Sequence, residues 1–99
     1  MQNLKHKYEC IYILDASLPE EDIQALIEKF SALITGSGVL ESIDEWGKRK
    51  LAYPINDLPE GYYVLVNFEC EADFPAELER IFKITDGVLR SLVIRKEEG

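Results

Sequence analysis

Residues 45–55 read EWGKRKLAYPI, and this stretch places three consecutive cations inside otherwise β-prone sequence. The run of Lys48, Arg49 and Lys50 repels itself and adds nothing to a core, so it indicates a solvated strand edge or a contact with a polyanion. The chain as a whole carries a formal net charge of −8, so this positive run contrasts with an acidic background.

The cationic run lies within a long extended pattern. It covers residues 39–55, and Gly47 near its middle indicates a bulge or a bend. Trp46, just before the expected bulge, is a candidate anchor for a partner protein, with a core position as the equal alternative. Turn residues fill positions 56–61, and residues 62–71 alternate as a further strand.

The segment before this pattern predicts a strand and then a helix. Residues 7–14 alternate with a period of two, and the face with Tyr8 is expected to meet the helices. Ser17 with Glu20 predicts a capping box for a helix whose apolar residues recur at helical spacing over residues 23–34. Glycines at positions 36 and 38 are expected to end it.

The C-terminal part predicts a second helix and a last strand. The helix is expected to start near Asp73 or Phe74 and to end at Gly87, before a strand over residues 88–96. The resulting order is that of the ferredoxin-like split βαβ arrangement, an α+β fold. Its first and third strands are central in a four-stranded antiparallel sheet, and both helices cover one face. One domain over residues 1–99 is expected, because 46% apolar content suffices for one core.

The other face of this sheet is left open. By alternation it carries Ile11, Ile13, Tyr63 and Leu65, which is more apolar than a solvated surface requires. Exposed apolar clusters of this kind mark interfaces, so we expect these four side chains to contact a partner.

The cations are grouped along the chain, although the negative net charge argues against a simple nucleic-acid binder. Eight of the eleven Lys and Arg residues fall in three groups, Lys5 with Lys7, Lys48 to Lys50, and Arg90 with Arg95 and Lys96. In the expected sheet the first and last strands are antiparallel neighbours, so Lys5 and Lys7 approach Arg95 and Lys96. We therefore expect the cations to gather at one margin as an RNA-binding surface that a partner protein completes.

Signals for catalysis, metal binding or a cofactor are weak. His6 is the only histidine, and neither it nor Cys10 and Cys70 has the spacing of a metal site. The cysteines are expected close together in neighbouring strands as buried free thiols. The loop at residues 14–19 lacks the Arg and Gly with which acylphosphatases of this topology bind anions. We expect no enzymatic activity, no cofactor and no metal.

Three further classes of protein share single features with this sequence. Aromatic-stacking RNA-recognition domains require a motif of which only Gly61 and Tyr62 fit, and Tyr62 is expected to face the core. A homodimeric small-molecule-binding or regulatory domain shares the topology and stays open as the alternative. No apolar run approaches the roughly 20 residues that span a bilayer, and the start lacks a secretory signal, so we expect a soluble cytoplasmic protein.

Residues 47–55, GKRKLAYPI, closely resemble a family signature in which a glycine and basic or polar residues precede Leu-Ala-Tyr-x-Ile. The family is that of the bacterial small-subunit ribosomal protein numbered six. The resemblance extends over the chain, through Lys-Tyr-Glu at residues 7–9, an acidic first helix, Gly-Tyr-Tyr at residues 61–63 and an apolar-basic last strand.

This resemblance implies a structural protein of the small ribosomal subunit, located in the cytoplasm and the ribosome. It implies binding to the central domain of small-subunit ribosomal RNA as a heterodimer with the basic small-subunit protein numbered eighteen. Within that picture RNA contact is expected from Lys5, Lys7, Arg90, Arg95 and Lys96, and contact with RNA or the partner from Lys48, Arg49 and Lys50. Trp46 and the apolar open face are expected to bind the partner protein.

Overall fold

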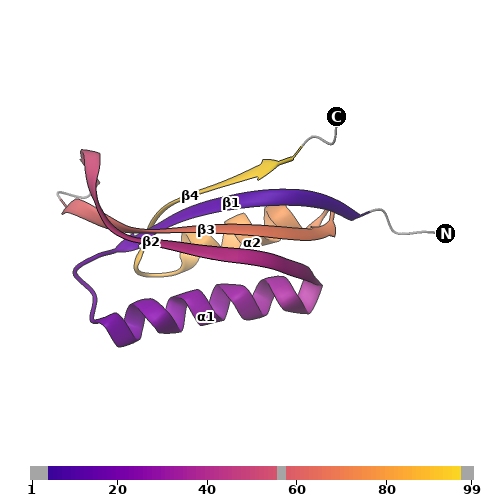
Figure 1. Cartoon of the computed structure of the whole chain (residues 1–99), viewed down its shortest axis with the longest axis horizontal. Helices are drawn as coiled ribbons and strands as arrows, with labels where there is room; N and C mark the ends of the chain where they lie inside the picture. The colour runs from indigo at the N-terminus through magenta and orange to yellow at the C-terminus, as the bar shows by residue number, and fades with distance from the viewer. Residues whose placement is uncertain (1–4, 56–57, 97–99) are drawn as a thin grey trace.

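The computed structural model describes residues 5–55 and 58–96, apart from the side chains of residues 5, 52–55 and 58. Its elements are β1 (Lys5–Asp15), α1 (Glu20–Ser37), β2 (Gly38–Ile55), β3 (Leu58–Glu71), α2 (Phe74–Ile84) and β4 (Val88–Arg95). The strands form one antiparallel sheet in the order β2-β3-β1-β4. Both helices lie on the same side of this sheet (Figure 1). The predicted ferredoxin-like split βαβ arrangement is therefore confirmed.

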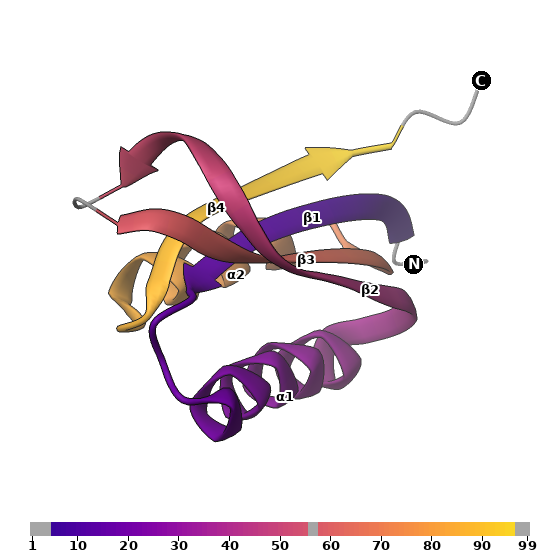
Figure 2. The same ribbon diagram turned by 60° about the vertical axis from the view of Figure 1, so that its left-hand side comes forward.

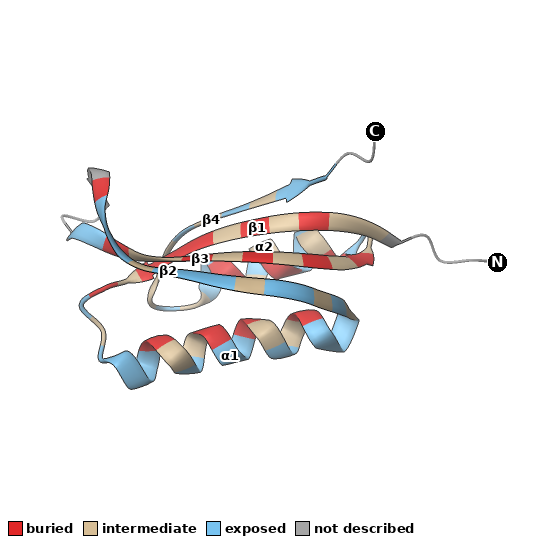
Figure 3. Ribbon diagram, in the orientation of Figure 1, coloured by how far each residue is buried: buried red, intermediate tan, exposed pale blue. Residues whose placement is uncertain are grey.

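The core fills the space between the sheet and the helices. Alternate side chains of the two central strands point into it and are at most 6% exposed, namely Tyr8, Cys10, Tyr12, Leu14, Val64, Val66, Phe68 and Cys70. Buried residues of α1 and α2 face them (Figure 3). The rings of Tyr12, Phe30 and Phe82 lie with centroids 4.5–5.2 Å apart. Burial of each such large side chain stabilises the fold by roughly 1.5–3 kcal/mol before conformational entropy is counted.

β2 is one long edge strand that bends where its register with β3 shifts. Pairing passes from Glu45, opposite Val64, to Gly47, opposite Tyr63, which leaves Trp46 as an extra residue. Gly47 has φ +82°, a left-handed conformation that favours glycine. The bulge predicted at Gly47 is confirmed, and the curved path of β2 is visible in Figure 2.

Some predicted element boundaries are wrong. The Ser17–Glu20 capping box does not form, because the Ser17 amide and hydroxyl both donate to Asp15 Oδ1, at 2.9 and 2.6 Å. Pro19 occupies the N-cap position of α1 without a side-chain cap. The helix continues through Gly36 to its end at residue 37, with Gly38 at the C-cap, so Gly38 ends it as predicted and Gly36 does not. β3 already begins at Leu58, so the predicted turn is shorter than residues 56–61, of which 56 and 57 lie outside the described residues.

The second helix begins close to its predicted position and ends earlier. α2 starts at Phe74 with Asp73 at its N-cap, as predicted. It ends at Ile84, followed by Thr85 at the C-cap, whereas the sequence predicted Gly87. Gly87 instead lies in the turn before β4, with φ +94°.

Both cysteines are buried and free, as predicted, but they are not close together. Cys70 pairs with His6, whereas Cys10 lies four positions further along β1. Four residues of a strand span about 13 Å, which is beyond the reach of a disulfide. Desolvation by burial raises the pKa of Cys10 to about 12 and that of Cys70 to about 11, so both thiols stay protonated and unreactive.

Candidate RNA and partner interface

The open face of the sheet carries a continuous apolar strip. Ile11 pairs with Leu65 of β3 on one side and with Leu92 of β4 on the other, which aligns three apolar side chains in one row. Ile94 lies one row further along β4. Leu92 is 54% exposed and Ile94 44%, so this strip offers accessible apolar surface to a partner.

Trp46 lies at the β2 end of this strip as the extra residue of the bulge. Its indole is 40% exposed and stacks on the ring of Tyr63, with centroids 6.2 Å apart and planes inclined by 14°. The indole Nε1 donates to Asp44 Oδ2 at 3.1 Å, and the Arg49 guanidinium carbon lies 6.0 Å from the ring centroid. The core alternative for Trp46 is therefore wrong. A held but accessible aromatic ring is suited to anchor a protein contact.

Ile13 differs from the other predicted open-face residues because it is only 8% exposed. A β-carbon at Gly61 of β3 would clash with Ile13 of β1 and would lie 3.3 Å from Leu51 of β2, so these two side chains lie over the glycine. Leu51 is itself 8% exposed. Ile13 is thus largely covered by its neighbours and offers little accessible area to a partner.

One basic group gathers where β1 begins and β4 ends. The Lys96 amide donates to the Lys7 carbonyl at 2.9 Å, and Arg95 pairs in register with Tyr8. The predicted approach of Lys7 to Arg95 and Lys96 is confirmed for the backbone. Lys5 begins β1 at the same end, and its side chain lies outside the described residues.

The side chains of this group have polar neighbours. Arg95 Nη2 lies 2.9 Å from His6 Nδ1, and Lys7 Nζ lies 3.8 Å from the Glu41 carboxylate. The pair between Lys7 and Glu41 is solvent-exposed, at 43% and 35% for the two side chains, so water and salt screen it. Carboxylates also lie opposite this group in the register, Glu71 opposite Lys5 and Glu69 opposite Lys7.

A second basic group lies at the opposite end of the sheet. The register places Lys48 in line with Leu14, seven residues after Lys7 on β1. At about 3.3 Å per residue, the groups are about 23 Å apart along the strand. Strand alternation directs Arg49 to the open face and Lys48 and Lys50 to the helix side. The expectation that the cations gather at one margin is therefore wrong.

Arg90 belongs to neither group. It pairs with Ile13 and lies exposed on the open face, five residues before Arg95 and about 17 Å from it along β4. Among the side chains that the structure describes, Arg90 and residues 48–50 form no ion pair. Their charge is therefore available to an anionic ligand.

Sequence reasoning did not single out Leu92 and Ile94, although they are the most exposed apolar residues of the strip. The run VLRSLVIR over residues 88–95 is apolar on both faces, so alternation alone does not distinguish them. In the register of β1 and β4, Leu92 lies opposite Ile11 and Ile94 lies opposite Glu9. This pairing identifies both as residues of the open face.

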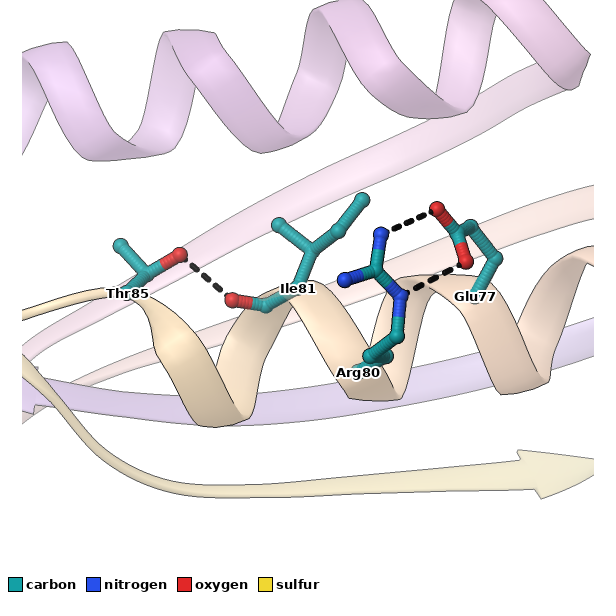
Figure 4. Close-up of polar contacts among 4 residues, drawn as sticks. All are labelled: Glu77, Arg80, Ile81 and Thr85. Atoms are coloured by element: carbon teal, nitrogen blue, oxygen red, sulfur yellow. Dashed lines mark hydrogen bonds and ion pairs between the residues drawn. The ribbon is translucent and has the colours of Figure 1, made fainter.

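The closest polar contacts on α2 join residues of that helix and its C-cap, and Lys29 of α1 also donates to the Thr85 hydroxyl at 3.5 Å. Arg80 donates two hydrogen bonds to the Glu77 carboxylate, at 2.9 and 2.7 Å, and the Thr85 hydroxyl donates to the Ile81 carbonyl (Figure 4). The hydrogen bond from Arg80 is the main cause of the lowered pKa of Glu77. No cluster suited to hold a metal ion occurs within residues 5–55 and 58–96. These contacts stabilise a helix and form no reactive site.

No helix of the described part of the chain is long and apolar enough to cross a membrane.

Comparison with known proteins gives the open face its context. The family model of ribosomal protein S6 matches residues 7–95. The chain belongs to the ribosomal protein S6 family. It is 54% identical over 92 residues to the small ribosomal subunit protein bS6 of Clostridium novyi, an alignment that covers 92% of this chain and 97% of the relative. The bS6 protein of Thermoanaerobacter pseudethanolicus is 55% identical over 92 residues, with the same coverage.

A solved structure of the family shares the fold. The crystal structure of 30S ribosomal protein S6 from Thermotoga maritima superposes with a TM-score of 0.89 at 28% identity, covering 94% of this chain and 89% of that one. As a member of the S6 family, the protein is a structural, non-enzymatic protein of the small subunit of the cytoplasmic ribosome.

Proposed function

We propose that this S6 protein binds the central domain of small-subunit ribosomal RNA as a heterodimer with the small-subunit protein numbered eighteen. The observation that carries the proposal is the apolar strip around Trp46 on the open face, with cations at both ends of the sheet. An apolar centre bounded by charge is the composition of a protein interface next to a polyanion site.

The partner protein occupies the open face in this proposal. Trp46 and Tyr63 are the aromatic residues that the partner contacts, and Ile11 and Leu65 provide apolar contact area beside them. Ile13 packs beneath this surface and contributes little contact area. Aromatic residues in the centre of an interface commonly contribute most of its binding energy. A basic partner complements the net charge of −8, which accelerates and orients the association.

The RNA contacts the cations at the two ends of the sheet and on the open face. They are Lys5, Lys7, Lys48, Arg49, Lys50, Arg90, Arg95 and Lys96. Two groups about 23 Å apart along one strand suit phosphates of a folded RNA better than a single short strand. Such contacts recognise the shape of the RNA through phosphates and ribose hydroxyls more than its base sequence.

The alternative from the sequence, a homodimeric small-molecule-binding domain, places a second copy on the open face. Two copies that each carry a net charge of −8 repel one another, which opposes that pairing. A stable homodimer in sedimentation velocity would nevertheless favour this alternative over the ribosomal proposal.

Titration calorimetry with purified protein eighteen tests the proposal directly. A one-to-one complex is expected, and the protein should then co-sediment with small subunits after a high-salt wash. Absence of a complex at micromolar concentrations of both proteins would contradict the proposal.

A further inference from the structure

Two side-chain contacts hold the bulge of β2 from opposite sides of the sheet. On the helix side, Glu45 Oε1 accepts hydrogen bonds from the Tyr62 hydroxyl at 2.8 Å and from Gln24 Nε2 at 3.1 Å. On the open side, the ring of Trp46 lies against Tyr63. Glu45 and Trp46 are adjacent in sequence, as are Tyr62 and Tyr63, the residues of β3 that they contact, so both contacts hold the same stretch of β2 against β3.

The indole of Trp46 is also held by its bond to Asp44 and by the nearby Arg49, but the backbone of the bulge has few other constraints. Trp46 has no cross-strand partner, because pairing with β3 passes from Glu45 directly to Gly47. A β-carbon at Gly47 would meet nothing within 4 Å, so no side chain packs on that side of the glycine. The backbone at Trp46 and Gly47 can therefore adopt more than one local conformation. Side-chain contacts of the neighbouring residues must select one of them.

Glu45 is suited to restrict this freedom because its carboxylate joins three elements. Gln24 belongs to α1 and Tyr62 to β3, while Glu45 itself precedes the bulged residue of β2. Burial and the hydrogen bond to Glu45 raise the pKa of Tyr62, so its hydroxyl keeps the proton that it donates. The backbone at Glu45 is thereby tied to both layers of the fold.

We propose that Glu45 is the positioning residue for Trp46, because its bonds to Tyr62 and Gln24 fix the bulge that directs the indole onto Tyr63. The indole is then presented to the partner in one orientation. Only this last step rests on the proposed function, since the positioning itself is a property of the free protein.

Fluorescence of the free protein tests the positioning, because Trp46 is the only tryptophan of the chain. Glu45→Ala is expected to raise the acrylamide quenching constant of Trp46 about twofold. The lost hydrogen bonds would no longer favour the conformation in which the indole packs on Tyr63, so the ring would be exposed more often. Glu45→Gln keeps an acceptor oxygen and should restore the wild-type constant. Glu21→Ala removes the same charge from an exposed site in the first turn of α1 and serves as the matched control.

Equal quenching constants for the wild type and a folded Glu45→Ala variant would overturn the proposal. Should Glu45→Ala not fold, Gln24→Ala and Tyr62→Phe each remove one donor and must raise the constant in its place. The affinity for protein eighteen then distinguishes a failure of the positioning proposal from a failure of the proposed partner interface. Greater quenching with unchanged affinity would keep Glu45 as the positioning residue and remove Trp46 from the partner interface.

Discussion

The amide of Lys96 donates a hydrogen bond to the carbonyl of Lys7 at 2.9 Å. This bond joins the end of β4 to the start of β1, and it brings together cations that are almost ninety residues apart in sequence. The second basic group lies at the opposite end of the same sheet. RNA bound in the proposed way is therefore held at two separate points, with the partner protein between them.

Arg95→Glu tests the first of these points. The variant should weaken RNA binding by the heterodimer and reduce the slope of log affinity against log salt concentration by about one, because one phosphate contact is lost. Arg80→Glu makes the same charge change on α2, where Arg80 already pairs with Glu77, and should leave the slope as it is. Filter binding over a range of salt concentrations measures both. Equal slopes for Arg95→Glu and the wild type would remove this residue from the contacts.

Trp46→Ala tests the anchor on the open face. Because the ring is 40% exposed and stacks on Tyr63, its removal should lower the free energy of unfolding by about 1–2 kcal/mol and leave the protein folded. Affinity for protein eighteen should fall by about thirtyfold, the loss typical of a central aromatic contact. Val39→Ala, at an apolar residue of β2 that is 48% exposed, is the control. If calorimetry gives the same affinity for both variants, the anchor lies elsewhere.

Gly47→Ala and Gly36→Ala form a matched pair for the bulge. Neither site has an atom within 4 Å of an added β-carbon, so the two substitutions differ only in backbone conformation. Gly47→Ala should destabilise the fold by about 1–2 kcal/mol, because φ is +82° there. Gly36→Ala lies within α1 and should stabilise it by about 0.5–1 kcal/mol. Urea denaturation measures both, and a neutral Gly47→Ala would mean that the bulge relaxes freely.

The buried Tyr12 hydroxyl makes a prediction about hydrogen bonding in the core. Within the described residues it has no hydrogen-bond partner, although the ring is fully buried. Tyr12→Phe should therefore be neutral or should stabilise the protein by up to about 1 kcal/mol. Tyr62→Phe removes the bond to Glu45 and should destabilise it by about 0.5–1 kcal/mol. Chemical denaturation that ranks the two variants in the reverse order would contradict this account.

Thiol chemistry tests the burial of the cysteines. Burial raises the pKa of Cys10 from 9.0 to about 12, so its stabilising effect is complete below pH 9 and is lost as the pH rises toward 12. The free energy of unfolding should fall over this window. At pH 8 a disulfide reagent should modify the native protein at least about a thousandfold more slowly than the urea-unfolded chain. Fast labelling of the native protein would show that these strands open readily.

The fold could be predicted from the sequence because its periodicities are strong. Alternation at residues 7–14 placed Tyr8, Tyr12 and their neighbours on the core face, and the structure confirms each of them. The order of the elements then left few topologies, since crossovers are right-handed and short. Gly47 also identified the bulge, because few other residues adopt its φ.

The distribution of charge and exposed apolar surface could not be predicted as well. It depends on register and on alternation within each strand. Arg90 and Arg95 were grouped by their closeness in the chain, yet five positions apart on β4 they lie on opposite faces. Ile13 was expected to be exposed, but it lies over Gly61 together with Leu51 and is only 8% exposed. The Ser17–Glu20 capping box failed because a nearer acceptor, Asp15, takes both hydrogen bonds from Ser17.

Binding of labelled central-domain RNA, titrated with this protein alone, with protein eighteen alone and with their equimolar mixture, tests the central claim most directly. The mixture should bind the RNA at least about tenfold more tightly than either protein alone, because the two proteins together form one RNA-binding surface that neither forms alone. Equal affinity of the mixture and of protein eighteen alone would contradict the claim that the two proteins bind as one unit.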